Sequence, residues 1–144
     1  MSPATGLDVF DATLHKTNDW LKDLMTKLPA RDKHEAYAAM RAVLHALRDR
    51  ITVVEVAQLG AQLTMLIRGF YYEGWDPAAT AVKERRRDQF LAHITRELRI
   101  AVSDRVDPEQ VARAVFTVLA QRVSDGEIAD VKQVLPRDVR ELWP

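Results

Sequence analysis

Two stretches of the sequence, RAVLHALRDRITVVEV at residues 41–56 and RAVFTVLAQRVSDGEI at residues 113–128, share one pattern. In each, apolar residues recur at intervals of three and four, which is the spacing of one face of an α-helix. Each stretch then reaches a threonine or serine followed three residues later by glutamate. This is the capping-box pattern, in which two side chains satisfy free backbone groups at a helix start. Each stretch therefore predicts a helix, a sharp break and the start of a second helix.

The similarity extends beyond these two stretches. When residues 36–72 are aligned with residues 108–144, nine of 37 positions are identical. The identical pairs are Arg41/Arg113, Ala42/Ala114, Val43/Val115, Leu47/Leu119, Arg50/Arg122, Glu55/Glu127, Ala57/Ala129, Leu63/Leu135 and Arg68/Arg140. Because the capping boxes and the apolar stripes stay in register, the alignment predicts an internal repeat. Phe10/Phe90 and Leu14/Ile94 suggest that the first helices of the two halves also correspond.

The rest of the chain is also predicted to be helical, so the expected fold class is all-α. No segment alternates apolar and polar residues well enough to predict a strand. We expect about eight helices, arranged as two related four-helix halves with approximate two-fold pseudo-symmetry. The expected helices cover residues 8–28, 32–51, 52–63, 65–72, 84–102, 108–123, 124–134 and 136–142.

The length of 144 residues suits a single compact domain spanning residues 1–144. A chain of this size buries about 70% of the surface that it exposes when unfolded. The repeat places one half at about residues 7–75 and the other at about residues 84–144. The sequence Asp76-Pro77 begins a stretch of small residues, which predicts a connector at residues 76–83.

Composition excludes several classes of protein. There is no cysteine, so disulfide frameworks, thiolate metal sites and cysteine nucleophiles are excluded. The 21 basic residues balance 21 acidic ones, which gives no overall field to attract nucleic acid or an acidic membrane. No apolar stretch approaches the ~20 residues that span a bilayer, and the N-terminus does not resemble a secretory signal. The expected location is the cytoplasm, without membrane association.

Four segments carry a resemblance to a known family. They are RAVLHALRDRI at residues 41–51, LIRGFYYEGWDP at residues 66–77, VSDGEIADVKQVLP at residues 123–136 and RELWP at residues 140–144. These segments resemble the bacterial domain of unknown function 2267, and the resemblance runs from about residue 7 to residue 144. It implies a helical bacterial protein. It supplies no activity and no catalytic residues.

Three histidines are each followed four residues later by a carboxylate, a spacing that can bring two metal ligands together on a helix. A metal-dependent enzyme is therefore one hypothesis. The simpler interpretation is an exposed ion pair on a helix surface, because His15 and His45 are predicted to point away from the apolar stripes. We predict no catalytic residue, no cofactor and no metal. The weak metal candidates are His15/Asp19, His45/Asp49 and His93/Glu97.

Large aromatic residues and repeated arginines are the other candidate binding groups. Aromatic side chains either anchor an interface or lock the two halves together. The interaction candidates are Trp20, Phe70, Tyr71, Tyr72 and Trp75. Guanidinium groups bind carboxylates within the fold, or an anionic ligand if both sets face one cleft. The ligand candidates are Arg41, Arg68, Arg113 and Arg140.

The basic run at residues 83–87 is predicted to form the solvated first turn of a helix, so nucleic-acid binding is not favoured. Since no enzyme motif is present, the leading hypothesis is a non-enzymatic interaction or scaffold module that associates with itself or with another protein. One alternative is a regulatory domain that holds a small anionic ligand between the two halves. A metal-dependent enzyme ranks third.

Overall fold

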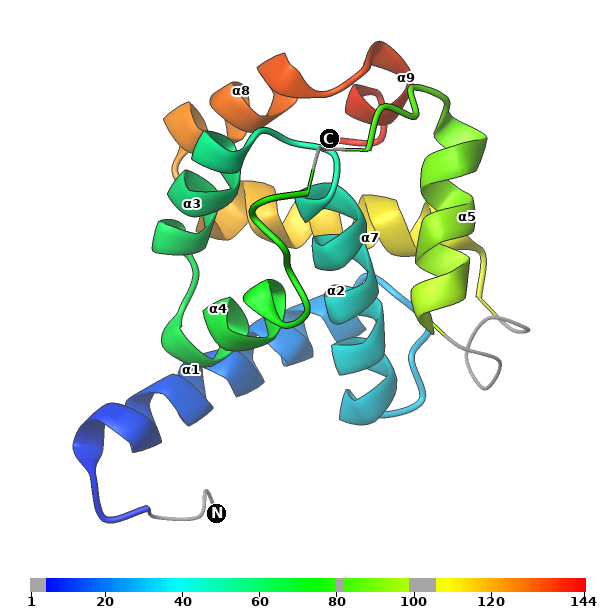
Figure 1. Ribbon diagram of the computed structural model, residues 1–144. Coiled ribbons are helices and arrows are strands. Elements are labelled where there is room, and N and C mark those ends of the chain that lie inside the picture. The colour runs from blue at the N-terminus through cyan, green and yellow to red at the C-terminus, as the bar shows by residue number, and fades with distance from the viewer. Residues whose placement is uncertain (1–4, 80–81, 99–105) are drawn as a thin grey trace.

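The computed structural model describes residues 5–79, 82–98 and 106–144. This part of the chain contains eight helices and no strand, which confirms the predicted all-α fold (Figure 1). The helices are α1 (Asp8–Met25), α2 (Lys33–Arg48), α3 (Val53–Gln62), α4 (Met65–Tyr72), α5 (Arg87–Leu98), α7 (Pro108–Arg122), α8 (Asp125–Val134) and α9 (Arg137–Arg140). Among the described residues, no helix combines the length and hydropathy that a membrane span requires.

Helices α2 and α7 form the centre of the molecule. Helix α2 packs against α1, α4, α5 and α7, and α7 packs against α1, α2, α5 and α8. Helix α2 can contact so many neighbours because its small and aliphatic side chains are buried on nearly every side, Val43 and Leu47 among them. Each fully buried side chain of this size contributes about 1.5–3 kcal/mol of transfer free energy.

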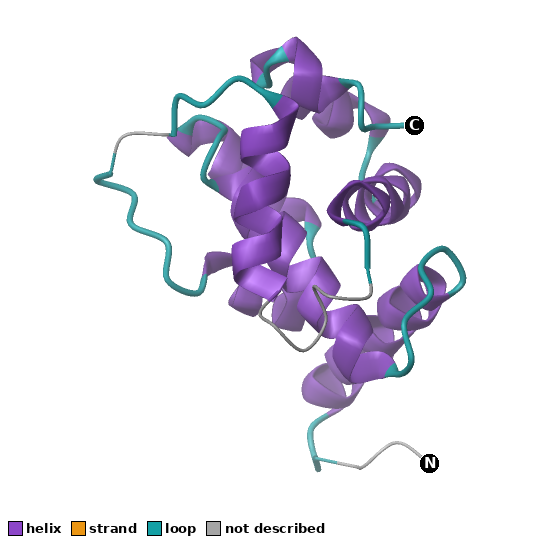
Figure 2. Cartoon of the chain, turned by 90° about the vertical axis from the view of Figure 1, so that its right-hand side faces the viewer, coloured by secondary structure: helices purple, strands orange, loops and turns teal. Residues whose placement is uncertain are grey.

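The helix contacts are consistent with the approximate two-fold relation expected between the halves. The packing of α1 on α2 is matched by that of α5 on α7, and the packing of α1 on α7 by that of α5 on α2. Helices α3 and α8, which lie in corresponding places in the alignment, pack against each other (Figure 1). The side view in Figure 2 shows the same all-helical arrangement with loops between the helices.

Corresponding residues make the same local contacts in the two halves. The hydroxyl of Thr52 accepts a hydrogen bond from the backbone N–H of Glu55 at 3.3 Å, and Ser124 does the same for Glu127. At the other ends of these helices, Arg68 donates to the carbonyl of Leu63 and Arg140 to that of Leu135, each at 2.9 Å. The arginines thus bind carbonyl groups that the helix itself leaves free.

Helix α1 differs from the expected correspondence. Phe10 is 45% exposed, whereas Phe90, its proposed counterpart, is fully buried. The buried ring of α1 is Trp20, and Arg122 lies over it in the way that Arg50 lies over Phe90. Trp20 therefore matches the environment of Phe90 better than Phe10 does. The first turns of α1 extend beyond the bundle (Figure 1).

The helix expected at residues 84–102 begins later, at Arg87, and residues 99–102 lie outside the described part of the chain. The reason is that Glu84 is held outside the helix, because one of its carboxylate oxygens accepts a hydrogen bond from Arg50 at 2.9 Å. The side chain of Gln89 then accepts a hydrogen bond from the backbone N–H of Arg86, where α5 starts. Residues 83–86 of the basic run consequently form a loop that leads into α5, and Arg87 is the first residue of the helix.

Candidate functional site

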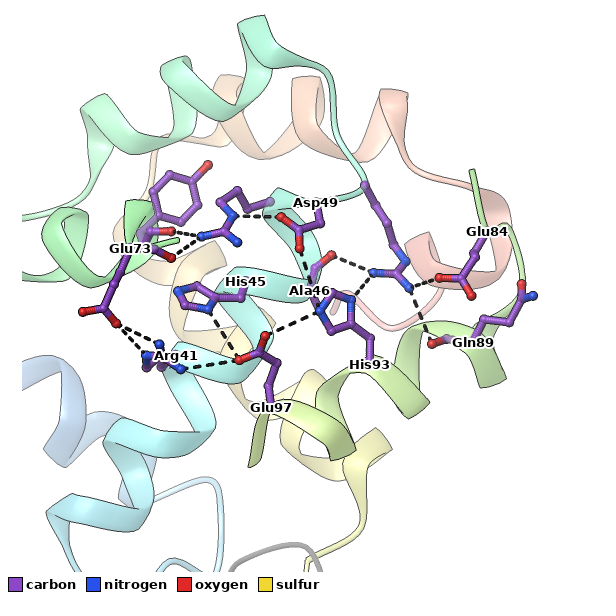
Figure 3. A network of polar contacts seen from close by, with 12 residues as sticks. Arg41, His45, Ala46, Asp49, Glu73, Glu84, Gln89, His93 and Glu97 are labelled. Carbon is purple, nitrogen blue, oxygen red and sulfur yellow. Dashed lines mark hydrogen bonds and ion pairs between the residues drawn. The ribbon is translucent and has the colours of Figure 1, made fainter. Parts of the chain in front are cut away.

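A network of polar side chains joins α2, α5 and the end of α4 (Figure 3). Arg41 lies at one end, where it donates two hydrogen bonds to Glu73, at 2.8 and 3.2 Å, and one to Glu97 at 3.4 Å. The hydrogen bond from Arg41 holds the pKa of Glu73 below its ordinary value. Glu97 continues the network, because its two oxygens face His45 and His93.

His45 is buried in this network, with 2% of its surface exposed. Its Nε2 lies 2.7 Å from the carbonyl oxygen of Phe70, and this nitrogen carries the hydrogen because a carbonyl only accepts. Its Nδ1 lies 3.6 Å from Glu97. Burial lowers the pKa of His45, which favours the neutral ring. The prediction that His45 forms an exposed ion pair with Asp49 is therefore wrong.

In His93 it is the other ring nitrogen, Nδ1, that makes the short hydrogen bond. Its Nδ1 lies 2.8 Å from Nη1 of Arg50 and accepts a hydrogen bond, because a guanidinium only donates. The ring hydrogen therefore sits on Nε2, which faces Asp49 at 3.8 Å and Glu97 at 3.7 Å. Burial, followed by the charge of Arg50, lowers the pKa of His93.

Two buried arginines complete the network, and the sequence did not mark either as a site residue. Arg48 donates to the carbonyls of Tyr71 and Glu73, both at 2.9 Å, and thereby fixes the end of α4. Arg50 donates to the carbonyl of Ala46 at 3.0 Å as well as to Glu84. A planar group with five donors suits this bridging of several acceptors. Both arginines hold the loop after α4 against α2.

The weak metal candidates fall into two groups. His15 and Asp19 lie on the exposed side of α1, 3.7 Å apart. The other four, His45, Asp49, His93 and Glu97, are brought together in the network of Figure 3. A metal needs an unprotonated ring nitrogen, and that of His93, Nδ1, is already in a hydrogen bond with Arg50. The unprotonated nitrogen of His45 is Nδ1, which faces Glu97, so only one of the two histidines offers a ligand atom. The hydrogen-bond pattern therefore argues for a structural role.

The aromatic candidates contribute mainly to the core. Trp20, Phe70 and Tyr71 are buried, whereas Tyr72 and Trp75 are partly buried against the core. The hydroxyl of Tyr71 donates to the carbonyl of Val56 at 2.9 Å, and burial raises the pKa of this phenol. The rings also contact one another in sequence, Tyr71 with Tyr72 and Tyr72 with Trp75.

The repeated arginines are engaged with groups of the protein itself. Arg41 pairs with carboxylates, and Arg113 binds Glu109 at 3.1 Å and the carbonyl of Glu141 at 3.3 Å. Arg68 donates to the carbonyls of Gly60, Ala61 and Leu63. Of the four, Arg140 also lines a pocket with Arg50.

That pocket lies mainly within the second half, with Arg50 as its one lining residue from the first, and measures about 570 Å³. One wall comes from the loop before α5 and the other from the end of α8 and the start of α9. Among the described residues, Lys83 and Arg85 are exposed and have no ion-pair partner. The pocket is lined by Arg50, Val82, Lys83, Glu84, Arg85, Gln133, Val134, Leu135, Pro136 and Arg140.

A second hollow is apolar and lies between α1 and α4. It measures about 490 Å³ and is lined by Thr17, Leu21, Tyr37, Leu66, Gly69, Phe70 and Glu73. A Cβ placed on Gly69 would have no neighbour within 4 Å, so the floor of the hollow is open at this point. This groove was not predictable from the sequence, because an exposed Leu66 in a short helix carries no signal of its own.

A family model described as "Uncharacterized conserved protein (DUF2267)" matches residues 17–142. The chain belongs to this family. The DUF2267 match includes all the residues that line the two pockets described above. It covers all eight helices at least in part, and only the first turns of α1 precede it. A search of curated proteins found no significant match. The DUF2267 assignment agrees with the resemblance seen in the sequence and leaves the activity to be inferred from the geometry.

Proposed function

We propose that this chain is a non-enzymatic interaction module of the bacterial cytoplasm that binds a second copy of itself where α1 and α4 meet. The observation that carries the proposal is a group of exposed apolar side chains at this end of the molecule. They are Leu7, Val9, Phe10, Met65 and Leu66, each at least 40% exposed. Apolar groups gathered in this way on a small protein are typical of an interaction surface.

These side chains form one surface because α1 and α4 are joined there. The backbone N–H of Leu66 donates to the hydroxyl of Thr13 at 3.0 Å. Phe10 lies one helical turn before Thr13 and therefore on the same face of α1. The apolar groove begins one turn further along, at Thr17. The exposed residues thus continue the groove, and we call the two together the α1–α4 surface.

A second copy is a suitable partner for three reasons. The first turns of α1 extend beyond the bundle and carry apolar side chains at Val9 and Phe10. If these turns lie in the groove of a second copy, the same contact forms twice and the dimer closes around a two-fold axis. The formal net charge of zero adds no overall repulsion between copies.

The polar network supports a module without a reaction of its own. Its histidines and arginines bind backbone carbonyls and neighbouring side chains, which is what a structural network does. The cysteine-free composition fits a reducing compartment such as the cytoplasm.

The test compares the oligomeric state of matched variants by sedimentation equilibrium. The wild-type chain is expected to form dimers, and Phe10→Glu with Leu66→Glu is expected to weaken the dimer at least tenfold. Each substitution buries a charge in an apolar contact, and about 1.4 kcal/mol is a tenfold change in affinity. The control is Val53→Glu with Val54→Glu, because these valines of α3 are at least as exposed and α3 packs mainly on α4 and α8. A monomeric wild-type chain, or an equal effect of the control, would overturn the proposal.

A second candidate function is binding of a small anion in the pocket between the loop before α5 and the α8–α9 end. The specific observation is that Lys83 and Arg85 line this pocket without ion-pair partners among the described residues. Inorganic phosphate titrated into the protein and followed by NMR is expected to shift the resonances of residues 83–85. Arg85→Gln is expected to weaken this binding, whereas Arg86→Gln, which removes a charge paired with Asp88, is not. Equal loss in both variants would indicate a general charge effect.

A further inference from the structure

The first turns of α3 and α8 meet at the contact between the two halves, and each brings a glutamate to it. Glu55 and Glu127 are a corresponding pair in the sequence alignment, and Asp130 lies one turn further along α8. One carboxylate oxygen from each of the three residues lies within 4.8 Å of the other two. We call these three residues the acidic cluster.

Glu127 lacks the hydrogen-bond donor that its position in the helix would normally supply. In a complete capping box, the glutamate side chain accepts the backbone N–H of the serine three residues before it. Here the N–H of Ser124 donates instead to the side chain of Gln62, at 3.2 Å. Glu127 is 8% exposed, and its Oε2 has no hydrogen-bond partner. Oε2 of Glu55 is buried without a partner as well.

A buried carboxylate without a donor is costly, so the charge of Glu127 has to be neutralised by a proton or by a cation. None of the three residues forms an ion pair with a lysine, arginine or histidine in the described part of the chain. Burial, then the negative charge of Glu55 and the hydrogen bond that the two carboxyl groups share when one is protonated, raise the pKa of Glu127 to about 7. A single proton neutralises only one of three carboxylates, whereas a divalent cation attracts all three.

We propose that Glu55, Glu127 and Asp130 bind a hard divalent cation, such as Mn²⁺, Mg²⁺ or Ca²⁺, between α3 and α8. Such ions take oxygen ligands about 2.0–2.6 Å away, so two ligands of one ion lie at most about 5 Å apart. The spacing within the acidic cluster meets this condition. Asp130 is exposed and gives the ion access from solvent, and water completes the coordination. The ion joins the two halves at their contact.

Binding of the cation must compete with the proton on Glu127. The titratable groups that face Glu127 are Glu55 on α3, Asp130 on α8 and Tyr71 on α4. Tyr71 stays neutral, since its pKa is raised. The charges that act on Glu127 are therefore those of Glu55 and Asp130. Because proton and cation compete for the same carboxylate, binding of the cation is expected to be weaker at low pH.

The experiment titrates metal-free protein with Mn²⁺ and measures the free ion by electron paramagnetic resonance. At pH 8 we expect one saturable site for each chain, and weaker binding at pH 5.5. Glu127→Gln and Asp130→Asn are each expected to weaken binding at least tenfold. The control is Asp125→Asn, because Asp125 also lies in the first turn of α8 but is not part of the acidic cluster.

Thermal unfolding of the metal-free protein shows whether Glu127→Gln still folds. The pKa of Glu127 is raised in the folded state, so the stability from its bound proton is complete below about 4.5 and lost as the pH rises through about 7. Glutamine does not titrate and can donate to Glu55, so this variant is expected to have the higher Tm at pH 8. A wild-type chain without saturable Mn²⁺ binding, or unchanged binding in Glu127→Gln, would overturn the proposal.

Discussion

Several arginines in this bundle donate to backbone carbonyls at the ends of helices. Arg48 binds the carbonyls of Tyr71 and Glu73 around the end of α4, and Arg68 and Arg140 bind carbonyls at the ends of α3 and α8. The last carbonyls of a helix have no hydrogen-bond donor within the helix, so without the arginines they would have to bind water. A single side chain with several fixed donors can satisfy two or three of them. The repeated arginines therefore explain how short helices stop sharply and the chain turns.

The role of individual polar residues was only partly predictable. The capping side chains of Thr52 and Ser124 follow from their local spacing, because the partner lies three residues away. His45 does not, because its partner is Phe70, twenty-five residues later. The side of α2 that carries His45 has no apolar stripe, and only the packing of α4 and α5 buries it.

The burial of His45 gives a pH prediction at the scale of the residue. Its pKa is lowered in the folded state, so the unfolded chain takes up a proton near the ordinary value of 6.5 before the folded chain does. Stability is therefore expected to fall as the pH drops below about 6.5. His45→Gln retains a donor for Phe70 but does not titrate. Urea denaturation at several pH values should show that this variant loses less free energy of unfolding than the wild type as the pH falls. An identical loss in the two proteins would contradict a lowered pKa of His45.

Among the elements, the helices were better predicted than their surroundings. Helix α4 was predicted at its observed residues 65–72, since Gly74 and the apolar spacing mark its limits. Helix α5 begins three residues later than expected, because the contact between Glu84 and Arg50 joins segments far apart in sequence. The α1–α4 surface was missed for the same reason: its two parts are separated by more than fifty residues.

Helix α3 packs closely against α4 at one glycine, which gives a prediction at the scale of the element. A Cβ on Gly60 would lie 2.8 Å from Cζ of Tyr72, too close for ordinary contact. Gly60→Ala must therefore move the Tyr72 ring and is expected to cost about 1–3 kcal/mol of unfolding free energy. Chemical denaturation measures this cost.

Gly126 of α8 is the matched control. A Cβ there has no neighbour within 4 Å, so Gly126→Ala is expected to stabilise the protein by up to about 1 kcal/mol, as alanine favours a helix more than glycine does. Equal effects of the two alanine substitutions would show that Tyr72 does not restrict position 60.

At the scale of the whole molecule, the two halves of the sequence are not two separate bundles. Helix α2 of the first half packs extensively on α5 of the second, and α1 packs on α7. The sequence predicted two related halves, but periodicity within a helix carries no information about which distant helix covers it. The choice of neighbours is a property of the folded chain.

This interlocked packing has a consequence for a chain that is cut in two. Fragments comprising residues 5–79 and 82–144, produced together in one cell, are expected to find each other and form a heterodimer with native helix content. Each fragment alone would leave the apolar sides of α2 or α5 uncovered and is expected to aggregate. Co-purification through a tag on one fragment measures the association. Two fragments that each fold in isolation would show instead that a half of this protein is a sufficient unit.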